Sequence, residues 1–79
     1  MKDDAIAIKV QELVAREAGI SVDQVQLSSQ LVEELDFDSL DTVSLVSTLN
    51  IDMGLAIEVE ELEDISTVGD LIKLVRSRS

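Results

Sequence analysis

The fold is decided by the stretch DFDSLDTVSLVSTLNIDMG, residues 36–54. Its apolar residues recur every three or four positions, the spacing that places side chains on one face of an α-helix. They are Leu40, Val43, Leu45 or Val46, and Leu49. Asp38 is a preferred N-cap residue, Asp41 adds a carboxylate to the same helix end, and Gly54 interrupts the pattern. We therefore expect a helix that begins directly after Asp38 and ends at Gly54.

Two more long helices are predicted on either side of this one. The first carries its apolar stripe at residues 6–18 and ends at Gly19, which suits a left-handed residue past a helix end. The last begins at Ser66 as N-cap and places Val68, Leu71, Ile72 and Val75 on one face. Residues 57–64 alternate apolar and acidic side chains, and with no second strand to pair, a short helix is preferred.

The long connection formed by residues 20–37 is expected to be a packed loop with a helical turn after Ser29. Its spaced apolar anchors are Val25, Leu27, Leu31 and Leu35. The predicted fold is therefore all-α: a small four-helix bundle, made of three longer helices and one short helix, with a long loop between the first and the second. We expect residues 1–79 to form a single domain.

The composition argues against several classes of protein. The chain has no Cys, His, Pro, Trp or Tyr, and Phe37 is its only aromatic residue. Disulfides and the usual structural zinc sites therefore cannot form. The side chains most often used as general base or activated nucleophile near neutral pH are also missing. We predict that the protein is not an enzyme and assign it no catalytic residue.

The charge is strongly and unevenly negative. Seventeen acidic and six basic residues give a formal net charge of -11, and residues 17–72 contain fourteen acids without one Lys or Arg. Such a field repels nucleic acids and anionic membranes and attracts basic protein surfaces. The sequence contains no signal peptide pattern and no stretch long enough to span a bilayer. We expect a cytoplasmic protein without nucleic-acid partners or membrane insertion.

The acidic cluster before the central helix resembles part of a calcium loop. Asp36 and Asp38 would occupy the first and third ligand positions of an EF-hand, but Leu40, Asp41 and Ser47 fall where that loop needs other residues. We predict no dedicated metal site, and only weak divalent-ion binding at Asp36, Asp38 and Asp41.

Ser39 stands out at the first turn of the central helix. As a nucleophile it would be poor, because neighbouring carboxylates oppose an alkoxide and no His or Lys is close in sequence. The simplest interpretation is a small polar residue at a capped helix start. A second interpretation is an exposed hydroxyl that another enzyme modifies.

The run LVEELDFDSLDTV, residues 31–43, resembles the prosthetic-group attachment motif of acyl carrier proteins. The resemblance extends over essentially the whole chain and needs no insertion. It includes Gly19-Ile20, the turn at residues 54–57 and the run Ile65-Ser66-Thr67-Val68. It implies that a phosphopantetheinyl transferase attaches 4'-phosphopantetheine to Ser39, beside Asp38 and Leu40. The terminal thiol of that arm would then carry acyl groups as thioesters. A helix N-terminus also favours the new phosphodiester.

The resemblance further implies a monomer that docks on acyl-transferring and acyl-modifying enzymes with basic or partly apolar surfaces. The residues expected to face these partners are Phe37, Asp38, Leu40, Asp41, Ser44 and Ile51. An acyl chain would enter a cleft between the second and last long helices. The residues expected to line it, when not simply core, are Val43, Val46, Leu49, Met53, Ile57 and Leu62.

Several positions depart from the family pattern. Asp36 replaces a common Gly, which Asp tolerates at modest cost if the position needs a positive φ. In many fatty-acid carriers, acids along this helix contact basic partner enzymes. Three of those positions here are Ser44, Asn50 and Ile51, so this face is less acidic and more apolar. The expected partner enzymes are those of fatty-acid synthesis or of a specialised lipid or polyketide pathway, and we interpret the altered face as specialisation for a dedicated pathway beside general fatty-acid synthesis. The alternatives are a peptidyl or aminoacyl carrier and, in another class, an unmodified acidic interaction module.

Overall fold

The computed structural model describes residues 2–78 and contains three α-helices and two 3-10 helices. The elements are α1 (Lys2–Ala18), η1 (Val22–Gln24), α2 (Ser39–Met53), η2 (Val59–Asp64) and α3 (Val68–Arg78). The predicted all-α architecture is confirmed, including the short helix near residues 57–64, which is a 3-10 helix. The three-residue η1 was not predicted.

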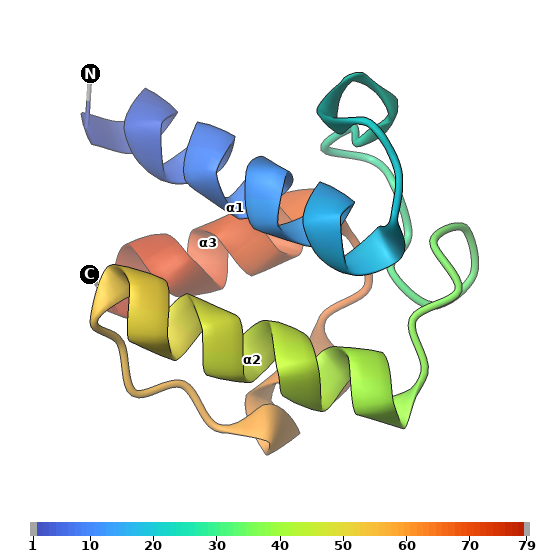
Figure 1. The fold of residues 1–79 in the computed structure, drawn as a ribbon. Helices are drawn as coiled ribbons and strands as arrows, with labels where there is room; N and C mark the ends of the chain where they lie inside the picture. Colours follow the sequence, from blue (N-terminus) through green and yellow to red (C-terminus); the bar gives the residue numbers. More distant parts are fainter. Residues whose placement is uncertain (1, 79) are drawn as a thin grey trace.

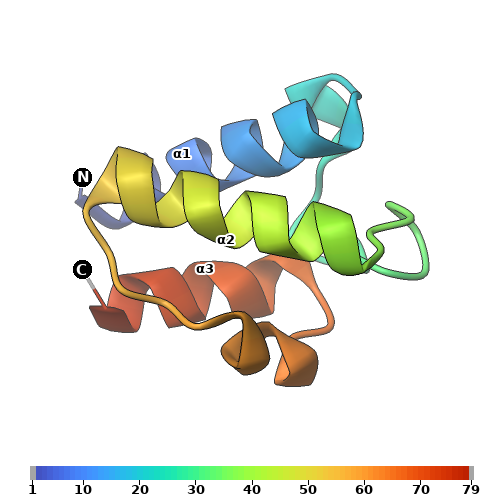
Figure 2. The same cartoon turned by 60° about the horizontal axis from the view of Figure 1, so that its bottom comes forward.

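The three α-helices lie side by side with α1 running opposite to α2 and α3 (Figure 1). The chain ends lie at one end of the bundle, and the long loop before α2 lies at the other. Figure 2 shows η2 outside the bundle of three α-helices, on the connection that returns from the end of α2 to the start of α3. The start of α2 is therefore surrounded by the long loop and η2, two segments without α-helical structure.

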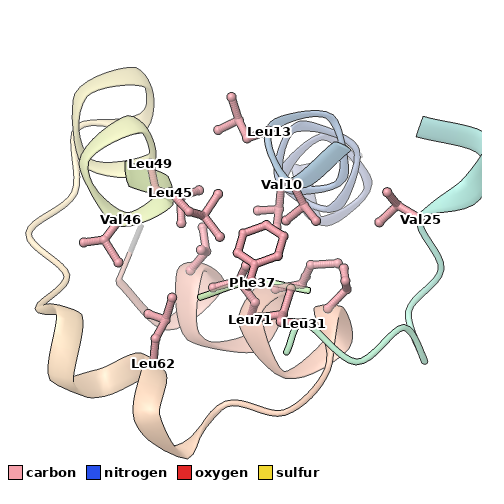
Figure 3. Close-up of a cluster of buried hydrophobic side chains, with 14 of the residues drawn as sticks. Val10, Leu13, Val25, Leu31, Phe37, Leu45, Val46, Leu49, Leu62 and Leu71 are labelled. Carbon is pink, nitrogen blue, oxygen red and sulfur yellow. The ribbon is translucent and has the colours of Figure 1, made fainter. Parts of the chain in front are cut away.

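One apolar cluster fills the space between the helices. It contains residues from all three α-helices, from the long loop and from η2, and Figure 3 shows the Phe37 ring in its midst with Val10, Leu31 and Leu71 around it. Leu13, Leu45, Leu49 and Leu71 are among the largest side chains that are almost wholly buried. Because so small a domain has a thin core, most of its packing is concentrated in this single cluster.

The predicted helix ends are confirmed with one correction. The carboxylate of Asp38 caps α2, and Gly19 and Gly54 adopt the left-handed conformation, with φ of 73° and 66°, just after α1 and α2. The cap of α3 is Thr67 and not Ser66, because the Thr67 hydroxyl accepts the Asp70 N–H at 3.1 Å. The carbonyl of Ser66 instead accepts the Leu31 N–H at 3.0 Å and ties α3 to the long loop.

The long loop is packed as expected, apart from one of its four anchors. Val25 and Leu31 are buried and Leu35 is half-buried, and the N–H groups of residues 34 and 35 donate to the Gln30 carbonyl in the predicted turn after Ser29. Leu27 was wrongly predicted as an anchor, since its side chain is 56% exposed. Its contribution comes from the backbone: the Leu27 carbonyl accepts the Gly69 N–H at 2.9 Å.

Candidate functional site

Two reciprocal hydrogen bonds fix the start of α2. Asp38 Oδ1 accepts the Asp41 N–H at 2.8 Å, and Asp41 Oδ2 accepts the Asp38 N–H at 3.3 Å. This capping box satisfies two backbone donors and holds the first turn in place. Ser39 is the first residue of the helix and is exposed. The N–H groups of Ser39 and Leu40 have no acceptor within the helix, because the first turn lies before any carbonyl that they could reach.

The residues just before the helix turn the Ser39 side chain outward. Asp36 has a φ of 59°, so the position does require the left-handed conformation that Asp tolerates. The next residue, Phe37, is 4% exposed and donates its N–H to the Leu31 carbonyl at 3.0 Å. The expectation that Phe37 faces partners is therefore wrong: burial of its ring anchors the motif to the core.

A hollow of about 500 Å³ opens beside Ser39. Its lining comes from the long loop, from the first two turns of α2, and from η2 and the residue after it. The lining residues are Val32, Phe37, Asp38, Ser39, Thr42, Val43, Val59, Leu62, Glu63 and Ile65. Such a volume lies within the range of sites for small molecules, and its walls are mostly apolar with a few polar groups at fixed positions.

The predicted cleft only partly coincides with this hollow. Val43 and Leu62 line it, whereas Val46, Leu49 and Ile57 are buried in the core and Met53 is half-buried away from it. The helical pattern could not separate the two groups, because core and cleft residues share one apolar stripe. The hollow also includes Val32, Val59 and Ile65, which were missed. The only signal for Val59 was its alternation with acids in residues 57–64.

The outer face of α2 carries an uncharged stripe. Leu40 is 79% exposed and Ile51 is 81% exposed. About three helical turns separate these two residues, so both lie on the same side of the helix. Between them Val43 is 47% exposed, and the exposed Ser44 hydroxyl donates to Glu17 Oε1 of α1 at 2.9 Å. Glu17 therefore brings a carboxylate to a position where α2 itself has none, which the sequence did not predict.

The acids around the motif do not form a metal centre. Within residues 2–78, no three Asp, Glu, His or Cys side chains are close enough together to hold a metal ion. The carboxylates of Asp38 and Asp41 already accept backbone N–H groups of the capping box. Weak divalent-ion binding at Asp36, Asp38 and Asp41 stays a prediction.

The arrangement suits a covalently attached, phosphate-containing group better than a reaction at Ser39 itself. An exposed hydroxyl lies at a helix N-terminus, where the helix dipole and the free N–H groups favour an anion. A flexible chain attached to that hydroxyl would lie beside the apolar hollow. Among the described residues, no helix is long and apolar enough to cross a bilayer.

Comparison with known proteins shows which protein family this chain resembles. Residues 9–75 match the family described as "Phosphopantetheine attachment site". The acyl carrier protein of Chlamydia trachomatis is 36% identical over 78 residues, covering 99% of this chain and 95% of that protein. The acyl carrier protein of Saccharopolyspora erythraea is 38% identical over 66 residues, covering 84% and 70%.

Solved structures agree with these sequence relatives. The crystal structure of an acyl carrier protein from Thermotoga maritima superposes with a TM-score of 0.77 at 31% identity, covering 99% of this chain and 91% of that one. The apo doublet acyl carrier protein from prodigiosin biosynthesis superposes with a TM-score of 0.81. At 21% identity it shows the fold alone, and this chain spans 38% of its length.

The helical fold and the family match define a phosphopantetheine-bearing domain. The relatives narrow that class, and the chain belongs to the acyl carrier protein family. Members of this family are carriers rather than catalysts, and the group they bear is phosphopantetheine.

Proposed function

We propose that the protein carries acyl groups as thioesters on a 4'-phosphopantetheine arm attached to Ser39. The observation that supports this is the exposed Ser39 hydroxyl at the start of α2 and at the edge of the hollow. The chain has no Cys and so cannot form a thioester with its own side chains. The thiol at the end of the arm supplies that chemistry when the arm is attached.

The attachment step requires a phosphopantetheinyl transferase and coenzyme A. Ser39 Oγ bonds to the phosphorus that bears pantetheine, the bond from that phosphorus to the bridging oxygen breaks, and adenosine 3',5'-bisphosphate leaves. The proton of Ser39 goes to a base of the transferase, because the chain has no His or Cys and carboxylates flank the serine. The N–H groups of Ser39 and Leu40 then face the new phosphodiester.

The reactions of the acyl group take place on partner enzymes, which we expect to dock on α2. The stripe formed by Leu40, Val43 and Ile51 offers apolar contacts next to the attachment site. Asp41 and the carboxylate of Glu17, held at Ser44, flank it with negative charge. A complementary partner therefore presents apolar side chains among basic ones. We assign the protein to the cytoplasm, where such enzymes and coenzyme A meet, as a single-domain monomeric carrier.

Intact mass after incubation with coenzyme A, magnesium and a promiscuous transferase tests this function. We expect a gain of one phosphopantetheine in the wild-type protein and no gain in Ser39→Ala. Ser28→Ala, at an exposed serine of the long loop that does not line the hollow, is the matched control and must gain the arm normally. Absence of any gain with several transferases would favour the unmodified interaction module.

We also propose that the carrier serves a dedicated lipid or polyketide pathway. The uncharged α2 stripe supports this, because apolar contacts depend less on charge steering and so less on salt. Titration of the arm-bearing protein against standard fatty-acid synthase enzymes tests it, and elongation at ordinary rates would contradict it. Loading by aminoacyl-activating enzymes instead would identify a peptidyl carrier.

A further inference from the structure

The side chain of Asn50 is turned away from the partner-facing stripe and holds the backbone of Ile57. Asn50 Nδ2 donates to the Ile57 carbonyl at 3.0 Å, and the Ile57 N–H donates to Asn50 Oδ1 at 2.9 Å. The carbonyl of Asn50 also accepts the N–H groups of Gly54 and Leu55. A single residue thus fixes the whole segment by which the chain leaves α2.

This segment controls the position of η2. Residues 54–58 lead directly into η2, and Figure 2 shows this connection leaving the end of α2 and running back along the bundle to η2. Val59, Leu62 and Glu63 of η2 form one wall of the hollow beside Ser39. Because 3-10 hydrogen bonds have poorer geometry and runs of six residues are uncommon, η2 depends on its anchors.

Two anchors hold the start of η2. One is the pair of bonds between Asn50 and Ile57. The other is Glu61, whose carboxylate accepts the Glu58 N–H and pairs with Arg78 of α3. The Glu61 contacts are exposed, whereas the Asn50 pair is partly buried and lies directly between α2 and the segment. The Asn50 pair and the packing of the buried Ile57 side chain are therefore the contacts that must break if this segment is to move away from α2.

The hollow is bounded on one side by η2, and none of residues 54–58 of the clamped segment lines it. It reaches Val43 and Leu62, and the next apolar residues, Val46, Leu49 and Ile57, are packed in the core. An acyl group that enters beside Ser39 can fill the hollow without disturbing this packing. A longer group would have to push η2 away from α2, and with it the preceding segment that Asn50 holds at Ile57.

We propose that Asn50 limits the length of the acyl group that the protein shelters, a proposal that rests on the proposed function. A short acyl group occupies the hollow with the Asn50–Ile57 pair intact. A long acyl group stays outside, because entry requires breaking two partly buried hydrogen bonds. Two such bonds correspond to about ten-fold or more in the opening equilibrium.

The rate at which hydroxylamine cleaves the thioester tests the proposal. Hexanoyl and dodecanoyl arms are transferred from the corresponding acyl-coenzymes A to the wild type and to Asn50→Ala. In the wild type we expect the hexanoyl thioester to be cleaved more slowly than free hexanoyl-pantetheine, and the dodecanoyl thioester at the rate of free dodecanoyl-pantetheine. In Asn50→Ala, the dodecanoyl thioester is cleaved more slowly than in the wild type, by about ten-fold or more.

Two further variants keep the experiment decisive. Gly19→Ala strains a left-handed residue at the end of α1 and destabilises the fold without touching the clamp, so its cleavage rates must follow the wild type. Asn50→Asp keeps the acceptor for the Ile57 N–H but loses the donor to the Ile57 carbonyl, and it is expected to be intermediate. If Asn50→Ala does not fold, Asn50→Asp carries the test.

Amide hydrogen exchange provides a readout that does not depend on the thioester. We expect the Ile57 N–H of the unloaded protein to exchange faster in Asn50→Ala than in the wild type, while Gly19→Ala leaves the difference between Ile57 and the rest of the core unchanged. Equal protection of hexanoyl and dodecanoyl thioesters in the wild type, or unchanged dodecanoyl cleavage in both Asn50 variants, would overturn the proposal. Failure to gain any arm, seen first by mass, overturns the proposed function and this inference with it.

Discussion

Replacing Phe37 tests whether this residue belongs to the core or to the partner surface. Its side chain is 4% exposed and lies in the cluster shown in Figure 3. Truncation of a buried Phe to Ala costs about 3–5 kcal/mol, and a domain of this length has a total stability of roughly 4–12 kcal/mol. Phe37→Ala is therefore expected to remove a quarter or more of the stability, and to unfold the protein if its stability is at the low end of that range.

Phe37→Leu permits a measurement on a folded protein. It keeps an apolar side chain and is expected to cost about 1 kcal/mol, which lowers the melting temperature of a domain of this size by roughly 4–8 °C. Urea unfolding followed by circular dichroism gives the stability, and an unchanged urea dependence shows that the unfolded state is the same.

Leu40→Ala and Ile51→Ala are the matched controls for this prediction. Both remove apolar atoms from the same region, but their side chains are exposed, so each is expected to change stability by no more than about 0.5 kcal/mol. A core position for Phe37 is refuted if Phe37→Leu unfolds at the wild-type urea concentration while arm transfer slows. It is equally refuted if the two exposed positions prove as sensitive as Phe37.

Three further predictions follow from the same structure. Asp38→Ala should lower the free energy of unfolding by about 1 kcal/mol through loss of the α2 cap, whereas Asp38→Ser should keep most of the capping stabilisation. Equal urea midpoints for the two variants would contradict the capping role. With a net charge of -11, the protein should melt at a higher temperature in millimolar magnesium or in added salt, and calorimetry showing no shift would exclude repulsion as a destabilising force. The Glu58 N–H, and then Arg78, hold the pKa of Glu61 below its ordinary value of 4.5. Ionised Glu61 therefore stabilises the fold fully above pH 4.5, and this stabilisation is lost as the pH falls through the lowered pKa. Glu61→Gln should be less stable than the wild type at neutral pH but not in strong acid.

The sequence was sufficient to predict the helices but not the division between core and hollow. Asp38, Gly19 and Gly54 act at helix ends through their own backbone and side-chain preferences, and these predictions were confirmed. Val43 and Val46 share one stripe of α2, yet one lines the hollow and the other is buried, because η2 covers only part of that stripe. Such a difference depends on where a distant segment packs, which periodicity does not encode.

The same limit explains the residues that were misplaced. Phe37 follows a turn set by Asp36, and its direction depends on the hydrogen bond to Leu31 across the loop. Leu27 has an apolar side chain typical of a core anchor, but it holds the loop through its carbonyl, which accepts the Gly69 N–H. Thr67 and Ser66 are equally good caps by residue type, and the bond from Leu31 to the Ser66 carbonyl decides between them. In each case a contact between distant segments overrides a local preference.

The three positions where α2 lacks the acids of many fatty-acid carriers differ in their contacts. Ser44 holds the carboxylate of Glu17, so negative charge is restored there from α1. Ile51 is exposed and extends the apolar stripe. Asn50 leaves the surface and clamps Ile57. A charge count along α2 would treat these substitutions as one loss, but the structure separates them into a change of partner surface and a constraint on the hollow. Ser44→Glu should therefore crowd a second carboxylate against Glu17. Ile51→Glu should raise the salt dependence of partner binding, whereas Asn50→Ala, which adds no charge, should leave it unchanged. A common response of all three positions would show that residue 50 acts on the surface after all.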